Sequence, residues 1–445
     1  MSLPWARPRH ELALLALVAV AVLTSMFDVS SQDVSRLCLT RALAHAEVRV
    51  DGCIDGNFDR ASFGGHLYSD KAPGMSALAL PAAEAVRLPP PERWTAEGDP
   101  RLWAVRVLSG GLAFLACAFL VGRVAEGLEP GFGGAALVAF ALGTLVAPLA
   151  ATTFGHVTAG TLAFGGFVLA WARRPAPAGL AAGAAVLVEF PAALAGAAVA
   201  VYVALRLGLR PLVRYAAGAL PALVLLGLYD RWAFGSPFHL PYRYVANRYA
   251  GDQSSGFFGI ATPRLHALQQ VLVGRGGLLV VTPVVVAAAA GLVLLARRRR
   301  AEALLCAAVT ACFLLVNVGY FLPYGGISPG PRFLVPALPF LALGLAPAFA
   351  RWRAATVALA AVSVVATVAV TLTWHAGGTA RYGRSIWAEI AQLPRHGGAS
   401  RIVSDSAKNV LVYAVSPRAR IPGDVIVCSC AAAAFLLGVG RLPRR

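Results

Sequence analysis

The stretch FDVSSQDVSRLCLTRALAHAEVRVDG (residues 27–52), continued by FDRASFGGHLYSDKAPGMSALALP (residues 58–81), is a polar segment set between two apolar runs. The runs cover residues 11–27 and 102–123, and each is long enough to cross the hydrocarbon core of a bilayer as a helix. Because the segment joins two spans, it predicts a large loop on one side of a membrane. Most of the chemical information in the chain lies in this loop.

The composition of the whole chain agrees with a membrane location. Of its 445 residues, 58% are hydrophobic and only 13% are charged, which is outside the range of soluble domains. Twelve apolar runs are of spanning length or slightly shorter: 11–27, 102–123, 132–151, 157–173, 178–189, 191–207, 213–230, 276–296, 302–320, 333–350, 354–373 and 424–440. We therefore expect an all-α polytopic membrane protein with about 12 transmembrane helices.

The arginines give the orientation of these spans. With twelve spans, the arginine clusters at the ends of the runs all fall on one face, which the positive-inside rule assigns to the cytoplasm. Both termini are then cytoplasmic, and the expected location is a bacterial inner membrane. The net charge of +18 is a consequence of topology. The basic segments lack interleaved aromatic residues, so we expect no nucleic-acid partner.

The segment 72–88 is apolar but is too short and too interrupted by proline, glycine and charge to cross the membrane. We expect it to form an outer juxtamembrane or re-entrant helix within the first outer loop, residues 28–101. The expected division of the chain is a transmembrane catalytic module at 1–373, followed by an outer segment and a final transmembrane helix at 374–445.

The first outer loop also predicts an amphipathic helix after Ser30, lying on the membrane, because apolar residues recur at helical spacing: Val34, Leu37, Cys38 and Leu43. Asp33 and Arg36 share a face of this helix. One interpretation is a first-turn acid with its i,i+3 partner, and the other is a carboxylate that accepts a proton from a substrate. Lys71 either snorkels to lipid headgroups or binds a phosphate beside a helix start.

At these residues the chain resembles the GT-C superfamily of integral-membrane glycosyltransferases, in particular an uncharacterised bacterial branch of the protein O-mannosyltransferase and aminoarabinose-transferase type. Asp33, with Asp28 as the alternative, matches the essential first-loop acid of the family, and the segment from Lys71 to Gly74 matches its lysine segment. His156 occupies a second-loop site where relatives often have an acid or another polar group. Looser matches are Phe234–Phe238, Tyr242–Tyr244, Gly274–Gly277 and Tyr324–Arg332.

The resemblance implies a sugar transfer with inversion, from a polyprenyl-phosphate donor to an envelope glycan, lipid or protein acceptor outside the cytoplasmic membrane, without a metal or another cofactor. The implied base is Asp33, with Asp28 as the alternative, and Asp33→Asn should then reduce turnover with little effect on stability. The other candidate residues bind the donor phosphate and lipid (Lys71, Arg243, Arg332 and Arg275) or the substrate (Tyr68, Asp70, His156, Tyr242, Tyr244 and Tyr324). The alternative function is a transporter or flippase of lipid-linked saccharides.

Two further features stay open at the level of sequence. Cys38 and Cys53 both lie in the first outer loop, so they can pair in an oxidising compartment. Glu189 lies at the turn between two short spans. It is either a cap of that turn or a functional carboxylate within the membrane.

Overall fold

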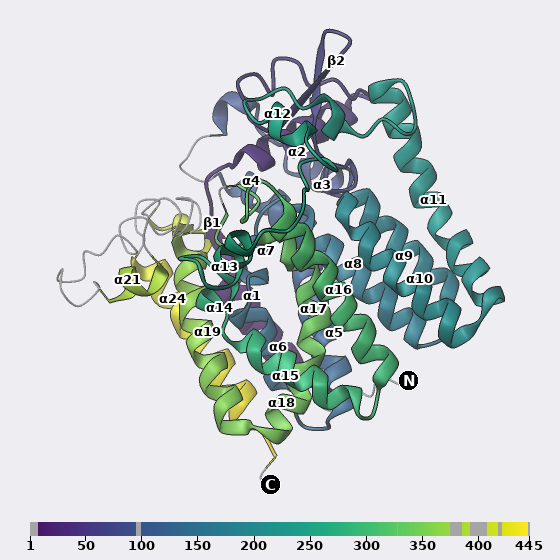
Figure 1. Cartoon of the computed structure of the whole chain (residues 1–445). Coiled ribbons are helices and arrows are strands. Elements are labelled where there is room, and N and C mark those ends of the chain that lie inside the picture. The colour runs from purple at the N-terminus through teal and green to yellow at the C-terminus, as the bar shows by residue number, and fades with distance from the viewer. Residues whose placement is uncertain are drawn as a thin grey trace.

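The computed structural model describes residues 8–94, 99–326, 328–373, 385–391, 407–416 and 421–443. These residues are mostly helical, and the helices run side by side with their loop-rich segments gathered at one end (Figure 1). This end carries β2 and α12, while the C-terminus and the turn between α18 and α19 lie at the opposite end (Figure 1). We call the loop-rich end, formed by the described residues of 25–106 and 235–264, the outer lobe, after the side of the membrane expected from the sequence.

The helices of the membrane-spanning part match the predicted apolar runs in position. Seven described helical segments are long and apolar enough to cross a membrane: Pro100–Leu128, Phe190–Leu207, Leu209–Phe234, Arg300–Gly319, Arg332–Arg351, Arg353–Thr373 and Ile421–Gly440. An eighth is a pair bent by 90°, Leu265–Val281 with Val284–Ala296. The other four predicted runs fall on shorter helices: α1 (Pro8–Leu23), α6 (Gly133–Gly143) with α7 (Val146–Ala150), α8 (Gly155–Trp171) and α9 (Pro175–Val188). The chain is thus a helical membrane protein.

Small residues allow α9 to pack closely on α11 (Leu209–Phe234). A β-carbon added at Gly179 would lie 1.8 Å from the backbone oxygen of Tyr215, and one added at Gly218 would lie 2.0 Å from that of Ala176. Backbones can approach this closely only where no side chain intervenes, as in small-residue helix pairs of other membrane proteins. This contact attaches α11, whose other faces expose leucine and valine, to the rest of the helices.

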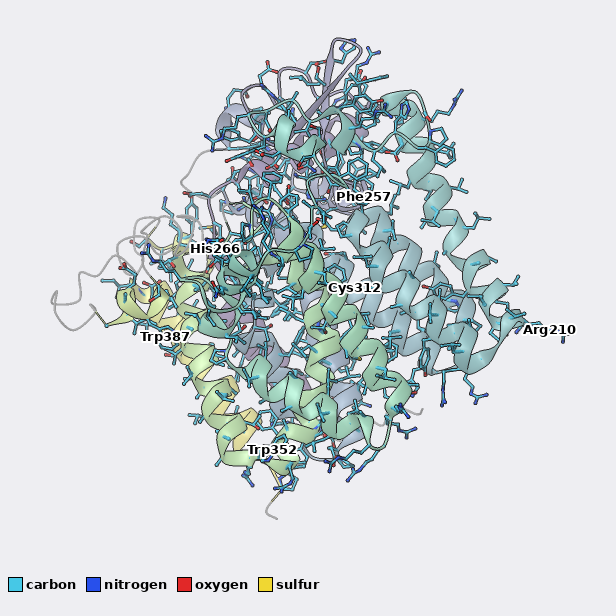
Figure 2. The ribbon with its side chains drawn as sticks, viewed as in Figure 1. Arg210, Phe257, His266, Cys312, Trp352 and Trp387 are labelled. Carbon is cyan, nitrogen blue, oxygen red and sulfur yellow. A yellow bond between two sulfur atoms is a disulfide. The ribbon has the colours of Figure 1, made fainter. Side chains whose placement is uncertain are left out.

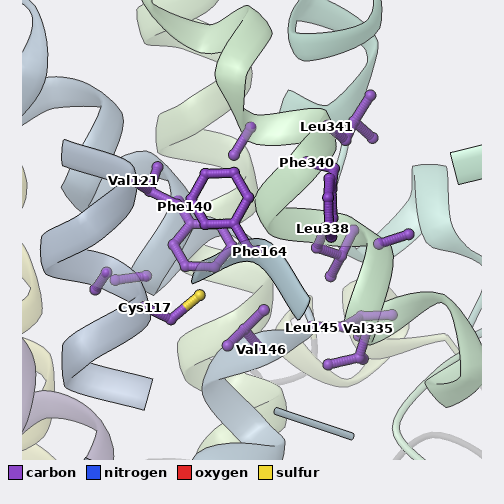
Figure 3. Close-up of a cluster of buried hydrophobic side chains, with 14 of the residues drawn as sticks. Cys117, Val121, Phe140, Leu145, Val146, Phe164, Val335, Leu338, Phe340 and Leu341 are labelled. Carbon is purple, nitrogen blue, oxygen red and sulfur yellow. The ribbon is translucent and has the colours of Figure 1, made fainter. Parts of the chain in front are cut away.

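Large apolar side chains fill the centre of the bundle (Figure 3). Phe140 of α6 and Phe164 of α8 are completely buried between α5 (Leu112–Leu128) and the segment that contains Val335 and Phe340. The rings of Phe164 and Phe340 are 5.4 Å apart and meet edge to face, an arrangement that aromatic pairs favour. This core fixes the helix ends that support the outer lobe.

The outer lobe contains the predicted helix after Ser30, which is α2 (Ser31–Ala44). Its first turn is held by a capping box, in which the Ser30 side chain accepts from the Asp33 amide and the Asp33 carboxylate accepts from the Ser30 amide. The helix predicted within 72–88 is α3 (Gly74–Ala85), which is too short to cross a bilayer and packs against α2. Both helices therefore belong to the lobe and not to the spanning part.

Two further links organise the lobe. Cys38 of α2 and Cys53 form a disulfide, so the hypothesis that they pair is confirmed. The strands β2 (Arg60–Phe63) and β3 (His66–Ser69) form an antiparallel hairpin, and its turn residues Gly64 and Gly65 both have positive φ, as a two-residue hairpin turn requires.

The predicted outer segment 374–423 falls largely outside the described residues. Within it, α21 (Ile386–Ile390) contacts α19 (Arg353–Thr373), and β4 (Lys408–Asn409) pairs with β1 (Ser25–Met26). The remaining elements are η1 (Pro91–Arg93), α4 (Pro100–Arg106), η2 (Val107–Gly111), η3 (Phe190–Ala192), α10 (Ala193–Leu207), η4 (Pro241–Tyr244), α12 (Ala250–Ser254), α13 (Leu265–Val273), α14 (Leu278–Val281), α15 (Val284–Ala296), α16 (Arg300–Gly319), η5 (Arg332–Ala337), α17 (Leu338–Leu341), η6 (Ala342–Gly344), α18 (Leu345–Arg351), α23 (Val410–Tyr413) and α24 (Ile421–Gly440).

The α9–α11 contact gives a first testable prediction. Gly179→Ala should lower the thermal stability of the purified protein in detergent, because its methyl group can be accommodated only if the two helix backbones separate. Gly165→Ala in α8 is the matched control, since the nearest atom to an added β-carbon there is 4.0 Å away. Equal melting temperatures for the two variants would contradict the close packing of α9 on α11.

Candidate functional site

The hairpin of the outer lobe brings two acidic residues together. Because Arg60 pairs with Ser69, the residues that flank the two strands, Asp59 and Asp70, lie next to each other at the open end of the hairpin. Lys71 follows directly, and its ammonium nitrogen is 2.7 Å from Asp59 Oδ1 and 3.1 Å from Asp70 Oδ2. The Ser31 hydroxyl also donates to Asp59. The hairpin thus holds a lysine between two carboxylates.

The two carboxylates differ in their pKa. Burial alone would raise the pKa of Asp59, but its ion pair and hydrogen bond with Lys71 outweigh this and lower it below the usual value. Burial raises the pKa of Asp70 to about 6, because Lys71 compensates only in part and the Asp59 charge adds to the effect. Asp59 is therefore the fixed counter-ion of Lys71, and Asp70 can gain or lose a proton near neutral pH.

These residues form part of the wall of a cavity of about 1150 Å³. Its ionisable lining comes from the outer lobe and from helix ends, whereas α9, α10, α11 and α16 contribute apolar residues: Val186, Leu194, Leu226 and Val316. Aromatic side chains of the 235–264 segment also line it, among them Phe257, which Figure 2 labels near the loop-rich end. The cavity thus joins a charged region to an apolar one, which suits an amphipathic ligand.

Arg332 lies in the cavity wall at the start of η5 and is 9% exposed. Its guanidinium carbon lies 5.4 Å from the ring centroid of Phe154 and 5.6 Å from that of Phe333. Its Nε atom is buried without a hydrogen-bond partner, and within the described ranges no carboxylate forms an ion pair with this side chain. Asp59 and Glu189 compensate its charge electrostatically but do not pair with it directly, so an anion bound in the cavity would form the direct contact.

A second group of charges lies in the same wall. Glu189 follows α9 and accepts a hydrogen bond from Arg36 of α2, and its Oε1 atom is 3.1 Å from Nδ1 of His156. Both Glu189 and His156 line the cavity, and both are buried. Of the two interpretations of Glu189, a mere cap of its turn does not fit, since the residue pairs with side chains from two other elements.

Asp33 lies elsewhere. It is fully buried, and its carboxylate accepts hydrogen bonds from both the amide and the hydroxyl of Ser30, from both the amide and the hydroxyl of Thr153, and from Arg106. It does not line the cavity, and its cationic partner is Arg106 of α4, not the expected Arg36. The i,i+3 pairing was wrong because burial of α2 on two sides gives each charge a partner from another element.

The cavity sorts the other predicted site residues into two groups. Five of them line it: Asp70, Lys71, His156, Tyr242 and Arg332. The others lie outside its lining: Asp28, Tyr68, Arg243, Tyr244, Arg275 and Tyr324. Tyr68 and Tyr244 pack on Phe234 in the small core of the lobe, and the Tyr324 hydroxyl donates to the backbone oxygen of Gln270.

Sequence reasoning missed Asp59, which lines the cavity together with Arg248. A signal for Asp59 was present, because two short alternating runs flank Gly64-Gly65 and so predict a hairpin that places Asp59 beside Asp70. Among the described residues, no group of three or more His, Cys, Asp or Glu side chains could hold a metal ion.

Comparisons with known proteins give the fold but no close relative. No protein-family model matches the chain, and no curated protein matches its sequence. The crystal structure of ArnT from Cupriavidus metallidurans bound to undecaprenyl phosphate matches 97% of this chain and 76% of its own, with a TM-score of 0.55 and 12% identity. Apo ArnT matches the same shares with a TM-score of 0.50 and 14% identity. The predicted resemblance to GT-C enzymes is thus confirmed at the level of fold.

The site of Asp33 leads to a prediction that differs from the one based on resemblance. Asp33→Asn should lower the stability of the protein markedly, by about 3 kcal/mol, because Arg106 would remain buried without its counter-charge. Thermal unfolding in detergent would measure this, with Asp55→Asn in an exposed part of the first loop as control. An unchanged melting temperature together with lost turnover would return Asp33 to a catalytic role.

Neutralising the two hairpin carboxylates should change the melting temperature in opposite directions. The raised pKa of Asp70 means that its ionisation destabilises the fold: the cost is fully present above about pH 6, decreases as the pH falls, and is gone only below the ordinary aspartate pKa of 3.8. Asp70→Asn should therefore melt at or above the wild-type temperature at pH 7.5 and approach it at pH 5. The lowered pKa of Asp59 means that its charge stabilises the fold at both values, so Asp59→Asn should melt lower at both.

Proposed function

We propose that this protein is a membrane glycosyltransferase that moves a sugar from a polyprenyl-phosphate donor to an acceptor on the outer face of the cytoplasmic membrane. The observation that carries the proposal is Arg332, a buried guanidinium that forms no ion pair within the described residues and lies in the wall of a partly apolar cavity. A phosphate bound there would provide the missing negative charge and accept hydrogen bonds from the guanidinium.

The donor phosphate would lie between Arg332 and Lys71. Both cations line the cavity, and the Asp59 carboxylate interacts electrostatically with each of them. Lysine and arginine stabilise the charge that develops on a departing phosphate, so this chemistry requires no metal ion. When the phosphate enters, Asp70 can take up a proton and so reduce the repulsion between the two anions.

The apolar wall of the cavity fits the polyprenyl chain. Val186, Leu194 and Leu226 come from helices whose outer faces are themselves apolar, so a chain in the cavity can continue into lipid. ArnT, which shares the fold, was crystallised with undecaprenyl phosphate. Undecaprenyl phosphate joins one phosphate to one long hydrocarbon chain. The cavity likewise has a charged wall and an apolar wall. The acceptor would be an envelope glycan, lipid or protein.

The proposal includes the topology expected from the sequence: about twelve spans, both termini cytoplasmic and the outer lobe facing outward, with α2 and α3 at the membrane surface. The support is that the described arginine-rich turns lie away from the lobe. Figure 1 places the turn between α18 and α19, which carries Arg351 and Arg353, at the end opposite β2. Since arginine marks the cytoplasmic side, the lobe belongs to the outer side.

A transporter or flippase of lipid-linked saccharides is the alternative. Such a protein would place polar residues along a path between the two faces. In the described parts of this chain, the ionisable residues of the large cavity belong to the outer lobe and the adjoining helix ends. This one-sided arrangement favours a reaction at one face over transport.

The phosphate site can be tested by binding. Arg332→Gln and Lys71→Ala should each weaken binding of undecaprenyl phosphate to the purified protein by roughly 10- to 100-fold, because a charge-assisted contact at a buried site contributes about 1.5–3 kcal/mol. Arg264→Gln is the matched control, since this exposed arginine of the outer side does not line the cavity.

The same preparation in a lipid nanodisc, with no second compartment, should release undecaprenyl phosphate from a polyprenyl-phosphate sugar when an acceptor is present. Undiminished affinity in both variants, or binding without turnover of any donor tested, would contradict the proposed transferase and favour the flippase.

A further inference from the structure

His156 combines burial with an arrangement known from catalytic histidines. It lies in the first turn of α8 (Gly155–Trp171), is 3% exposed, and lines the large cavity. Its Nδ1 atom is 3.1 Å from Glu189 Oε1. We propose that His156, oriented by Glu189, is the base that removes the proton from the acceptor hydroxyl. This inference rests on the proposed transferase function and names the residue that performs its proton transfer.

The hydrogen-bond partners determine which ring nitrogen can act. Glu189 also accepts a hydrogen bond from Arg36, a cation that favours the ionised carboxylate. An ionised carboxylate can only accept, so the neutral imidazole places its hydrogen on Nδ1 and leaves the lone pair on Nε2. Nε2 is therefore able to accept a proton. This is the orienting role that a carboxylate plays toward histidine in hydrolytic triads.

Nε2 is also unpartnered among the described residues, and it is buried. The ring is held between Phe154 and Phe333, whose centroids lie 6.1 and 5.7 Å from it, so it has little freedom to rotate toward another partner. A buried polar atom without a partner is unfavourable, and a hydroxyl group bound in the cavity would satisfy it.

The other acids are less suited to this role. Asp59 and Asp70 contact Lys71, which we assign to the departing phosphate. Each of these two carboxylates is therefore already engaged by that cation. Asp33 lies outside the lining of the cavity. His156 lines the cavity and has no hydrogen bond or ion pair with Lys71 within the described ranges.

The reaction then balances as a single displacement. The acceptor oxygen forms a bond to the anomeric carbon while its proton passes to His156 Nε2. The bond between the anomeric carbon and the phosphate oxygen breaks, and its electron pair leaves with the polyprenyl phosphate. Lys71 and Arg332 stabilise that anion, and the Glu189 carboxylate stabilises the imidazolium until the proton passes to solvent.

The experiment compares His156→Gln with wild type in nanodiscs. Glutamine keeps polar contacts but has no basicity, so turnover of a polyprenyl-phosphate sugar should fall by roughly 100-fold or more. The affinity for undecaprenyl phosphate should stay within about threefold, since the phosphate contacts are those of other residues. His266→Gln is the control, because this histidine of α13 is exposed and does not line the cavity (Figure 2).

A second variant distinguishes a base from a residue that only supports the fold. His156→Ala leaves a space beside the cavity, and added imidazole should restore part of the lost rate. Across a series of substituted imidazoles of similar size, the restored rate should increase with the basicity of the added compound.

Three results would overturn the inference. His156→Gln could turn over the donor as fast as wild type, or it could lose turnover and undecaprenyl phosphate affinity to the same extent. The third result is that none of the added imidazoles restores the rate of His156→Ala. All three require a wild-type protein that turns over a donor. If wild type releases no undecaprenyl phosphate from any donor, the proposed function itself fails, and that outcome is distinct from the other three.

Discussion

The requirement that buried charges be compensated organises the region where the outer lobe meets the helices. In this low-dielectric layer an unpaired ion is much more costly than at a surface. Asp33 pairs with Arg106, Arg36 with Glu189, and Lys71 with Asp59 and Asp70. The first two pairs join different elements and so fix α2, α4 and the end of α9 relative to one another. The Lys71 pairs lie within the hairpin, which the Ser31–Asp59 hydrogen bond attaches to α2. Within the described ranges Arg332 forms no such ion pair, and this exception supports the proposed phosphate site.

The pairing also explains which features of the site could be predicted from sequence. The amphipathic spacing after Ser30 and the interrupted segment 72–88 depend on local pattern, and both became helices of the lobe. Lys71 was identified because it stands directly before a Pro-Gly helix start and matches the family's lysine segment, and Arg332 because the positive-inside rule disfavours arginine in an outer loop. Which residue forms an ion pair with a given charge cannot be predicted from local pattern, since Arg36 and Glu189 are 153 positions apart in the chain. Asp33 was therefore matched with the wrong arginine, although the position of its helix was predicted correctly.

Residues that are close together in the sequence can differ in function, because they lie on different sides of a hairpin or turn. Tyr242 and Tyr244 belong to one short 3-10 helix, yet Tyr242 lines the cavity and Tyr244 stacks on Phe234 at an angle of 8°. Asp70 and Tyr68 are likewise two positions apart, and only Asp70 reaches the cavity. A motif identifies such a segment, but the backbone path decides which side chain faces the substrate.

The charge arrangement gives the proposed function a physical basis. Lys71 is shared by two carboxylates, one of which has a raised pKa, and Arg332 forms no ion pair within the described residues. Under the proposal, a phosphate between the two cations would supply negative charge to Arg332 and would allow Asp70 to become neutral. The departing polyprenyl phosphate would carry a greater charge than the intact donor. The two cations would then bind the leaving group more strongly than the donor, which is the differential interaction that catalysis requires.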